Sequence, residues 1–473
     1  MKQTKVGLKN LDKEAYHIVC NWYKVVDFNP VYNGIDYSLI IRFYLWDKIG
    51  RAIRIKHGIS DNEVELYQKD LQQINSFYHQ PFISNGTYSK PIIKTKASVF
   101  IPFPSKYTEQ LYESLKTKHK LKIFFKHASG KQQKHIIKSI SYKSDTTFAS
   151  LLYNAFIESL EHFNLSLYHK DYTLLKEQIE GAVNSVALSY EELKAYKPNA
   201  VFVHSDNHPP YINYVLNAKK LGIPTFTYQH GLDCEHYYLD DCFADYVAVW
   251  NYYKKNNYKS SSTFKPTKFA VIGNHLQEKG QDTLSYDVNS EQKTIVYITR
   301  PHKSIKCYSP SRVYHEGKDI LNCILELVSS SSNLEVIIKP HPMDEKVLYQ
   351  NLIKERQLEE RVAIVDEPIE EIIKPNSIII TEDSTAGVEA LKYSLPCIHA
   401  HFANSNPVLP FLEYEAAYLA TTSSELEDAF KKILNLSAIE LQQMRLGQQK
   451  MITDLIPEGR SVDLANFINE NIK

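Results

Sequence analysis

Three common signatures are missing from this sequence of 473 residues, and each absence excludes a class of protein. No apolar run approaches the roughly 18 residues that a membrane-spanning helix needs. No P-loop motif of the GxxxxGK type occurs, which argues against a P-loop nucleotidase. No GxGxxG motif opens a strand-to-helix unit, which argues against a dinucleotide oxidoreductase.

The sequence also lacks an excess of charge and a cysteine framework. Lys plus Arg and Asp plus Glu number 55 each, so the overall charge gives no indication of a nucleic-acid partner. The six cysteines show no CxxC spacing, and no secretory signal is recognised. This pattern is typical of reduced thiols in a cytoplasm, not of a disulfide frame or a zinc site. We therefore expect a cytoplasmic protein.

One segment departs from the even balance of charge. From Lys116 to Lys143 the chain has nine lysines and no Asp or Glu. Such a segment is either a solvated loop or hairpin face, or a surface that meets an anionic lipid or an anionic glycan. The second alternative predicts peripheral contact of Lys116–Lys143 with the inner face of the cytoplasmic membrane.

Short apolar segments alternate with helical patterns over most of the chain, which predicts an α/β fold with parallel strands and right-handed crossovers. The length exceeds what one core usually supports, so we predict two Rossmann-like domains that face each other across a cleft. The predicted parts are residues 1–90 as an N-terminal extension or insertion of open role, 91–275 as an acceptor-side domain, 276–292 as a linker, 293–455 as a nucleotide-donor domain, and 456–473 as a C-terminal helix that packs back on the N-terminal domain.

Lys339-Pro340-His341-Pro342 follows the apolar strand expected at 334–338. The two prolines fix φ and stiffen the loop, so that the side chains between them are held at the strand end. Lysine offers a positive charge to a phosphate, and histidine offers a ring N–H donor. We interpret Lys339 and His341 as phosphate ligands at the carboxyl end of a parallel strand, where open α/β sheets bind nucleotides.

A second strand end, after the strand expected at 377–380, runs directly into a helix. Ser384 and Thr385 stand where that helix begins and can either cap it or bind an anion there. Glu389 lies one turn further on, where it can accept hydrogen bonds from ribose hydroxyls, and Gly387 lies between them. Just past the first strand of this half, Arg300 is a further candidate contact to the donor.

The N-terminal half offers two candidate general bases. His230 lies in Gln229-His230-Gly231, where a glycine lets the backbone approach a ligand closely, and its side chain titrates near neutrality. Asp206 follows the preceding strand and needs no tautomer arrangement to accept a proton. The sequence does not decide which of Asp206 and His230 is the base. No Asp-x-Asp pair stands at a strand end, so we expect no metal and no other cofactor.

Taken together, Gln229-His230-Gly231, Lys339-Pro340-His341-Pro342 and the run from Glu382 to Leu391 resemble bacterial GT-B glycosyltransferases of surface-polysaccharide synthesis. The resemblance covers roughly residues 200–400. It is closest to capsule-type transferases of 3-deoxy-2-ulosonic acids, such as ketodeoxyoctonate, sialic and pseudaminic acids, and to the CDP-glycerol glycerophosphotransferases of teichoic-acid synthesis. Both groups use cytidine nucleotides.

The resemblance implies that His341, Ser384 and Thr385 hold the donor phosphate and that Lys339 adds positive charge. The acidic glycine-containing motif that supplies the base in many sialyltransferases is not recognisable here, so the base stays open between Asp206 and His230. The expected activity is inverting transfer of an ulosonic acid from a CMP-linked donor to a glycan or glycolipid acceptor. The alternatives are a CDP-glycerol or UDP-sugar transferase, a non-hydrolysing sugar epimerase of the same fold, or a non-catalytic subunit of polysaccharide assembly.

Overall fold

A computed structural model describes residues 8–58, 97–126, 140, 142, 145–232, 241–262, 264–275, 284–300, 315–342, 346–402 and 407–472. The chain divides into two compact units. The N-terminal unit contains residues 13–230, 237–277 and 458–473, and the C-terminal unit contains residues 1–12, 231–236 and 278–457. Part of the predicted extension (59–90), part of the predicted linker and four lysines of Lys116–Lys143 lie outside the described residues.

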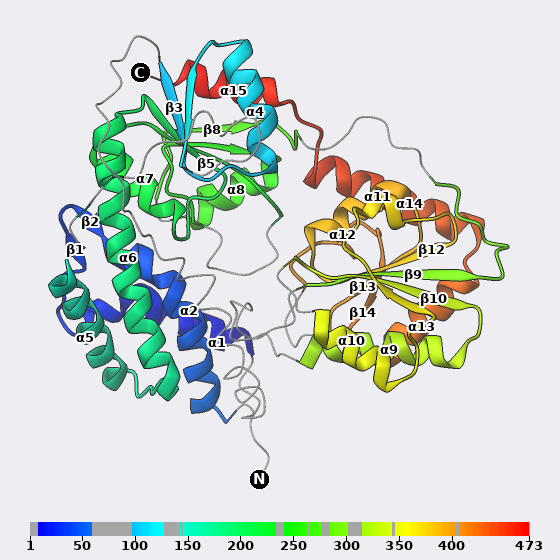
Figure 1. The fold of residues 1–473 in the computed structure, drawn as a ribbon. Coiled ribbons are helices and arrows are strands. Elements are labelled where there is room, and N and C mark those ends of the chain that lie inside the picture. The colour runs from blue at the N-terminus through cyan, green and yellow to red at the C-terminus, as the bar shows by residue number, and fades with distance from the viewer. Residues whose placement is uncertain are drawn as a thin grey trace. The chain divides into compact units, whose positions relative to one another are not determined.

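Each unit is built on a six-stranded, fully parallel sheet (Figure 1). The predicted α/β class with two parallel-sheet domains is therefore confirmed. In the described part of the chain, none of the helices combines the length and the apolar character that crossing a bilayer requires.

The sheet of the N-terminal unit has the strand order β4-β3-β5-β6-β7-β8. Its strands are short and, apart from the edge strand β8, almost wholly buried, because helices cover a parallel sheet on both faces. They are β3 (Ser98–Ile101), β4 (Lys122–Phe125), β5 (Ala200–Val203), β6 (Thr225–Tyr228), β7 (Tyr246–Val249) and β8 (Lys268–Val271). The helices that join or cover them are α4 (Lys106–Thr117), α7 (Tyr211–Lys220), α8 (Tyr252–Ser261) and α15 (Ser461–Glu470).

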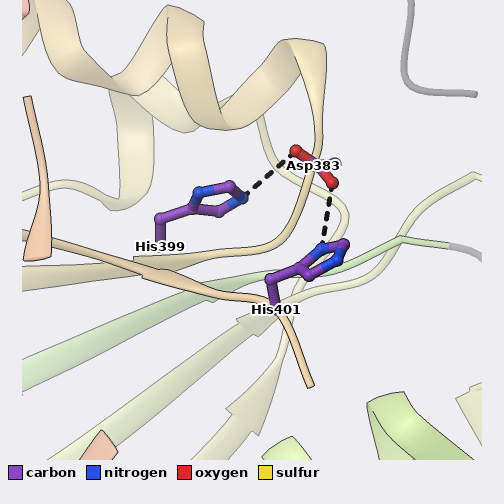
Figure 2. A group of neighbouring side chains, drawn as sticks. All are labelled: Asp383, His399 and His401. Atoms are coloured by element: carbon purple, nitrogen blue, oxygen red, sulfur yellow. Dashed lines mark ion pairs between the residues drawn. The ribbon is translucent and has the colours of Figure 1, made fainter. Parts of the chain in front are cut away.

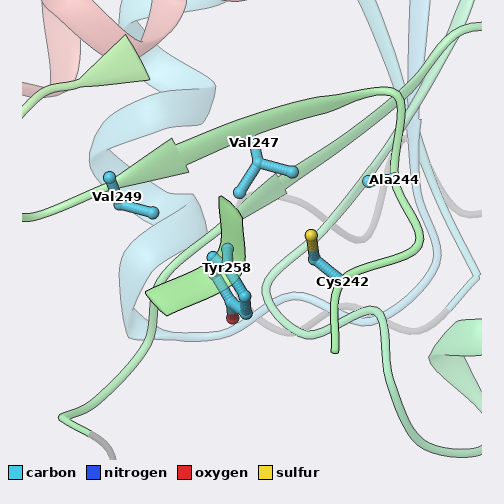
Figure 3. Packing of buried hydrophobic residues seen from close by; sticks show 5 residues of the cluster. All are labelled: Cys242, Ala244, Val247, Val249 and Tyr258. Carbon is cyan, nitrogen blue, oxygen red and sulfur yellow. The ribbon is translucent and has the colours of Figure 1, made fainter. Parts of the chain in front are cut away.

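One buried cluster shows how these strands acquire their core. Val247 and Val249 alternate along β7 and pack with Cys242 and Ala244 of the preceding segment and with Tyr258 of α8 (Figure 3). Two residues apart on a strand, the valines point to the same face, which is the pattern of a strand covered by a helix. β7 itself pairs with β6, the strand that precedes His230.

The C-terminal helix α15 belongs to the N-terminal unit and packs against α4. The hydroxyls of Ser114 and Ser461 lie 3.0 Å apart, and a ring nitrogen of His119 lies 3.1 Å from the side-chain oxygen of Asn466. The last residues of the chain therefore form part of the N-terminal unit's structure.

Residues 13–58 also form part of that unit. A helical layer of α2 (Tyr37–Lys56), α5 (Thr146–His162) and α6 (His169–Tyr196) packs through α6 onto α7, with α1 (Leu8–Asn21), the 3₁₀ turn η1 (Trp22–Lys24) and the hairpin β1 (Val31–Tyr32) and β2 (Ile35–Asp36) alongside. No role for residues 1–90 could be predicted from the sequence. In the structure, α2 is a buried part of the layer that supports the sheet.

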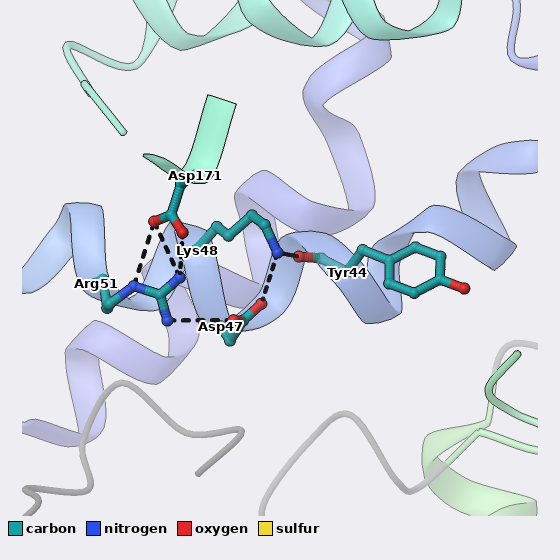
Figure 4. A network of polar contacts seen from close by, with 5 residues as sticks. All are labelled: Tyr44, Asp47, Lys48, Arg51 and Asp171. Atoms are coloured by element: carbon teal, nitrogen blue, oxygen red, sulfur yellow. Dashed lines mark hydrogen bonds and ion pairs between the residues drawn. The ribbon is translucent and has the colours of Figure 1, made fainter. Parts of the chain in front are cut away.

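A buried polar network joins α2 to α6 (Figure 4). The guanidinium of Arg51 donates to both carboxylate oxygens of Asp171 at 2.9 Å and to Asp47 at 3.1 Å. Lys48 donates to the carbonyl of Tyr44 at 3.0 Å. Charges with so little exposure are tolerated only when they are paired, so this network fixes the register of α2 on α6.

The sheet of the C-terminal unit has the order β11-β10-β9-β12-β13-β14, which is 3-2-1-4-5-6 along the chain, the Rossmann order. The strands are β9 (Lys293–Ile298), β10 (Leu334–Lys339), β11 (Val362–Ile364), β12 (Ser377–Thr381), β13 (Cys397–Ala400) and β14 (Tyr418–Ala420). The other elements are α9 (His315–Ser330), α10 (Lys346–Glu355), α11 (Ile369–Ile372), α12 (Thr385–Ala390), the turn η5 (Leu391–Tyr393), α13 (Ser423–Leu434) and α14 (Ala438–Leu455).

Candidate functional site

The strand order of the C-terminal unit reverses beside β9. The chain first adds β10 and β11 on one side of β9 and then adds β12 to β14 on the other. Ligands of open α/β sheets bind at the carboxyl ends of the strands at such a switch point. Ile298, the last residue of β9, pairs with Lys339 of β10 and with Thr381 of β12. Three strands therefore end level with one another at this edge.

Hydrogen bonds tie the three strand ends together. Thr299 donates its backbone N–H to the Lys339 carbonyl at 3.2 Å, and its hydroxyl accepts the backbone N–H of His341 at 2.9 Å. On the other side, Glu382 Oε1 accepts the backbone N–H of Arg300 at 3.1 Å and the Tyr297 hydroxyl at 2.9 Å. The loops that carry the predicted donor residues are thus fixed to each other by short contacts.

The structure places Lys339 and His341 at the end of β10, as the strand prediction requires. Both are half-buried. The Lys339 amine donates to the backbone carbonyl of Asp366 at 2.5 Å, toward β11, so its charge stands on the side of the site away from β12. Lys346, at the start of α10, pairs with the carboxylate of the same Asp366. Lys303, which follows Arg300 in the sequence, lies outside the described residues.

Ser384 and Thr385 follow β12, the strand on the opposite side of β9. Ser384 occupies the position before the first residue of α12, yet its hydroxyl makes no capping hydrogen bond. The Thr385 hydroxyl accepts the backbone N–H of Leu232 at 2.9 Å, and a Cβ on neighbouring Gly231 would lie in ordinary contact with it at 3.4 Å. The Ser384 hydroxyl therefore does not cap α12, and the Thr385 hydroxyl is bound to the loop that contains Leu232.

Gly387 and Glu389 differ in what they do in α12. A Cβ added to Gly387 would lie 2.0 Å from the Thr381 hydroxyl oxygen, so the glycine is needed for the close approach of α12 to β12. Glu389 is half-buried one turn along the helix. The glycine thus acts through helix-to-strand packing, as the glycine after a nucleotide-binding strand does in dinucleotide folds.

Arg300 lies beside a group of three side chains that was not predicted from the sequence. Its guanidinium lies 3.9 Å from the carboxylate of Asp383, which is also paired with His399 at 3.2 Å and with His401 at 3.1 Å (Figure 2). Burial by itself would raise the pKa of Asp383, but these partners hold it well below its usual range. The signal in the sequence was a His-x-His pair at the end of a predicted strand.

In the N-terminal unit the strand order reverses between β3 and β5, because β3 pairs with β4 on one side and β5 on the other. Three histidines gather beyond this edge. The rings of His204 and His230 lie 5.8 Å apart, and Tyr211 packs against His204 at 4.6 Å and His208 at 5.1 Å. His230 is the exposed member, and Tyr107 donates its hydroxyl to the His230 carbonyl at 2.7 Å.

The two other histidines are neutral at physiological pH. Burial, reinforced by the neighbouring His230, lowers the pKa of both His204 and His208 to about 3. The Ser205 hydroxyl lies 2.9 Å from Nδ1 of His208. His230 therefore sits beside two uncharged imidazoles and not beside fixed positive charges.

The other candidate base, Asp206, points into the protein. It is 3% exposed, and its Oδ2 accepts the backbone N–H groups of Phe243 and Ala244, each at 2.7 Å. Burial raises its pKa, although these hydrogen bonds act in the opposite direction. The carboxylate thus joins the end of β5 to the segment before β7, and it is not presented to solvent.

Comparison with known proteins gives one family match. Residues 223–400 match the family model described as "Capsule polysaccharide biosynthesis protein". The matched stretch begins just before β6, includes the Gln229-His230-Gly231 loop and ends with β13. No curated protein sequence matches the chain.

The chain is similar to several solved structures at low sequence identity. S. aureus MnaA in a co-structure with UDP is 14% identical, with 79% of this chain and 96% of that chain covered and a TM-score of 0.49. UDP-GlcNAc 2-epimerase from Neisseria meningitidis, bound to UDP-GlcNAc, is 14% identical over 79% and 98%, with a TM-score of 0.44. The apo lipopolysaccharide outer core galactosyltransferase WaaB is 15% identical over 79% and 98%, with a TM-score of 0.43.

Proposed function

We propose that this chain is an inverting glycosyltransferase of surface-polysaccharide synthesis that uses a CMP-linked 3-deoxy-2-ulosonic acid as its donor. The observation that carries the proposal is the level ending of β10, β9 and β12 at the switch point of the C-terminal sheet. The match of residues 223–400 to a capsule-synthesis family supports a role in surface-polysaccharide synthesis. Cytidylate as the nucleotide comes from the resemblance of the motifs.

The donor side of the reaction belongs to the C-terminal unit. The His341 ring and the Ser384 hydroxyl, on the loops after β10 and β12, are the groups that we assign to the phosphate of the leaving cytidylate. Lys339 and Arg300 add positive charge on the two flanks of these loops. Donors fixed before the reaction stabilise the charge that develops on the leaving group without having to reorganise.

The acceptor side belongs to the N-terminal unit, and we assign the base to His230. Its imidazole takes the proton from an acceptor hydroxyl while that oxygen forms the new bond to the anomeric carbon. The bond from this carbon to the cytidylate oxygen breaks, and the electron pair leaves with the phosphate. His230 is the exposed candidate, whereas both hydrogen bonds to the Asp206 carboxylate come from the backbone of its own unit.

We also propose that the reaction takes place at the cytoplasmic face of the membrane, where a glycolipid acceptor would be found. Lys116, Lys118 and Lys120 are exposed at the end of α4 and support this placement. The amine of Lys116 lies 5.2 Å from the ring centroid of Tyr112, and that of Lys122 lies 4.8 Å from the ring centroid of Phe124. We expect the chain to co-sediment with anionic vesicles and not with neutral vesicles.

Ligand-dependent thermal stability tests the donor assignment. A nucleotide at 100 times its dissociation constant should add about 2.7 kcal/mol to the free energy of unfolding. We expect CMP to stabilise the chain, and His341→Ala or Ser384→Ala to reduce that effect. Thr453→Ala, which removes an exposed hydroxyl of α14, is the matched control. Stabilisation by CDP-glycerol or by UDP, without any by CMP, would overturn the CMP-ulosonate assignment in favour of those donors.

Turnover decides whether the chain is an enzyme at all. Incubation with a CMP-ulosonate and an acceptor glycan should release CMP in proportion to the product formed. If the chain binds CMP yet releases none with any acceptor tried, the non-catalytic assembly subunit replaces the transferase as the better interpretation.

A further inference from the structure

The parallel pairing of β12 and β13 brings Asp383, His399 and His401 together. His399 lies in β13 and pairs with Thr381, the last residue of β12. Asp383 follows Thr381 by two residues, and His401 follows His399 by two. Side chains two residues apart on a strand point to the same face, so both histidines are directed to one side of β13. Figure 2 shows both rings turned toward the carboxylate from the end of β12.

The three side chains are buried and close enough to share one ion. Nε2 of His399 lies 3.2 Å from Oδ1 of Asp383, and Nδ1 of His401 lies 3.1 Å from Oδ2. The side chains of Asp383 and His399 are at most 1% exposed, and that of His401 is 8% exposed. One ligand atom from each residue lies within 4.8 Å of the other two.

His399 provides a second, independent observation. Neither of its ring nitrogens has a hydrogen-bond partner among the described residues, although the side chain is almost fully buried. Its ring packs against Phe411, with ring centroids 4.4 Å apart. Nε2 faces the carboxylate at 3.2 Å without the geometry of a hydrogen bond. A buried polar group without a partner is costly, and a bound ion is one of the few explanations for it.

We propose that Asp383, His399 and His401 bind one divalent transition-metal ion of the zinc class. Two imidazoles and one carboxylate suit zinc, cobalt or iron, whereas magnesium and calcium prefer oxygen ligands. The carboxylate is already oriented from outside, because the backbone N–H of Leu409 donates to Oδ1 at 2.9 Å and that of Val408 donates to Oδ2 at 3.2 Å. Such outer contacts are typical of metal-ligating carboxylates.

Arg300 competes with the proposed metal ion for the carboxylate of Asp383. Its guanidinium lies 3.9 Å from Oδ2 of Asp383, so it balances part of the negative charge that the ion would use. The rival arrangement is an Arg300–Asp383 ion pair with two neutral histidines and no metal. The two arrangements differ in a measurable way, because only the first retains metal in proportion to protein.

The direct test is metal content of the full chain. The chain is stripped with a chelator, incubated with Zn²⁺, passed through a desalting column and analysed by elemental mass spectrometry. We expect one zinc per chain, and visible d–d bands from a Co²⁺-substituted sample that indicate nitrogen ligands. Because the ligands must be deprotonated, less zinc should be retained as the pH is lowered.

Variants locate the ion. His399→Gln and His401→Gln should each reduce the zinc retained to well under half an equivalent, whereas His169→Gln, at an exposed histidine of α6, should leave it unchanged. Circular dichroism in the absence of metal checks that each variant folds. If one does not, the d–d bands of the Co²⁺-loaded chain without substitutions, which indicate nitrogen ligands, replace it.

Absence of stoichiometric zinc in the unsubstituted chain, or equal retention by all variants, would overturn the metal site. This outcome is separate from the transferase proposal, since metal retention is measured without donor or acceptor. A chain that releases CMP but retains no zinc refutes only the metal site, and one that retains zinc but binds no nucleotide refutes only the donor assignment.

Discussion

The carboxylate of Glu382, at the end of β12, accepts the backbone N–H of Arg300, at the end of β9, over 3.1 Å. The same oxygen accepts the Tyr297 hydroxyl at 2.9 Å. One buried side chain therefore joins the two strands between which the C-terminal sheet reverses its order. The relationship makes Glu382 a positioning residue for the loops that we assign to the donor.

Glu382→Ala should leave a buried N–H and a buried hydroxyl without an acceptor and cost about 1–3 kcal/mol for each group. Glu382→Gln retains an oxygen that can accept both and should cost much less. Chemical denaturation measures the difference in unfolding free energy. Equal stability of the alanine and glutamine variants would show that the joint between β9 and β12 does not depend on this side chain.

His230→Ala should lower turnover by about 10²–10⁴-fold without changing CMP-induced stabilisation, because a base acts on the acceptor and not on the donor. His162→Ala, at an exposed histidine that ends α5, is the control and should keep full activity. Release of CMP under saturating donor is the measurement. Turnover within a few-fold of the unsubstituted chain would remove His230 from the mechanism.

Substitutions at Asp206 separate a structural role from a catalytic one. Asp206→Ala leaves the N–H groups of Phe243 and Ala244 without an acceptor and should cost about 2–4 kcal/mol. Asp206→Asn can still accept these N–H groups, so it should retain most of the stability and, in our assignment, most of the turnover. A stable Asn variant with no turnover would instead identify Asp206 as the base.

Gly387→Ala should destabilise the C-terminal unit by about 1–3 kcal/mol, because its Cβ would lie 2.0 Å from the Thr381 hydroxyl oxygen. Gly181→Ala is the matched control. It lies within α6, and a Cβ added there would have no neighbouring atom within 4 Å, so alanine should stabilise the chain by up to about 1 kcal/mol. Thermal unfolding of the two variants should therefore shift in opposite directions.

Stability should fall as the pH drops from about 6.5 toward 3. The pKa values of His204 and His208 are about 3 in the folded chain and about 6.5 when unfolded, so within this range the unfolded state binds more protons. Each histidine contributes a loss of up to about 1.4 kcal/mol per pH unit. Asp383, whose pKa is held well below its usual range, adds its own loss only below about pH 4.

Denaturation midpoints at pH 7, 6, 5 and 4 measure this slope. His204→Gln should make it shallower, and His169→Gln should leave it unchanged. A slope that is the same in all three chains would show that His204 does not titrate with unfolding in this range.

The alternation of apolar segments was sufficient to predict two parallel-sheet domains, because buried parallel strands need continuous apolar runs with helices between them. It also placed Arg300, Lys339, His341, Ser384 and Thr385 at strand ends, since a strand end can be recognised where apolar residues give way to polar ones. The alternation could not show which strands lie side by side in the sheet. The sequence does not say that β12 pairs with β9 and β13.

The sequence by itself therefore determined the fold class and the strand ends that carry polar side chains. Only the tertiary structure decided which of those side chains meet and which way they point. Asp206 and His230 follow neighbouring strands and were equivalent in the sequence, yet one turns inward to two backbone N–H groups and the other is exposed. The Asp383, His399 and His401 cluster likewise exists only because parallel pairing places the end of β12 beside that of β13. The local pattern of apolar and polar residues determines whether a segment is a helix or a strand and where it ends. Packing of the whole unit determines which strand pairs with which.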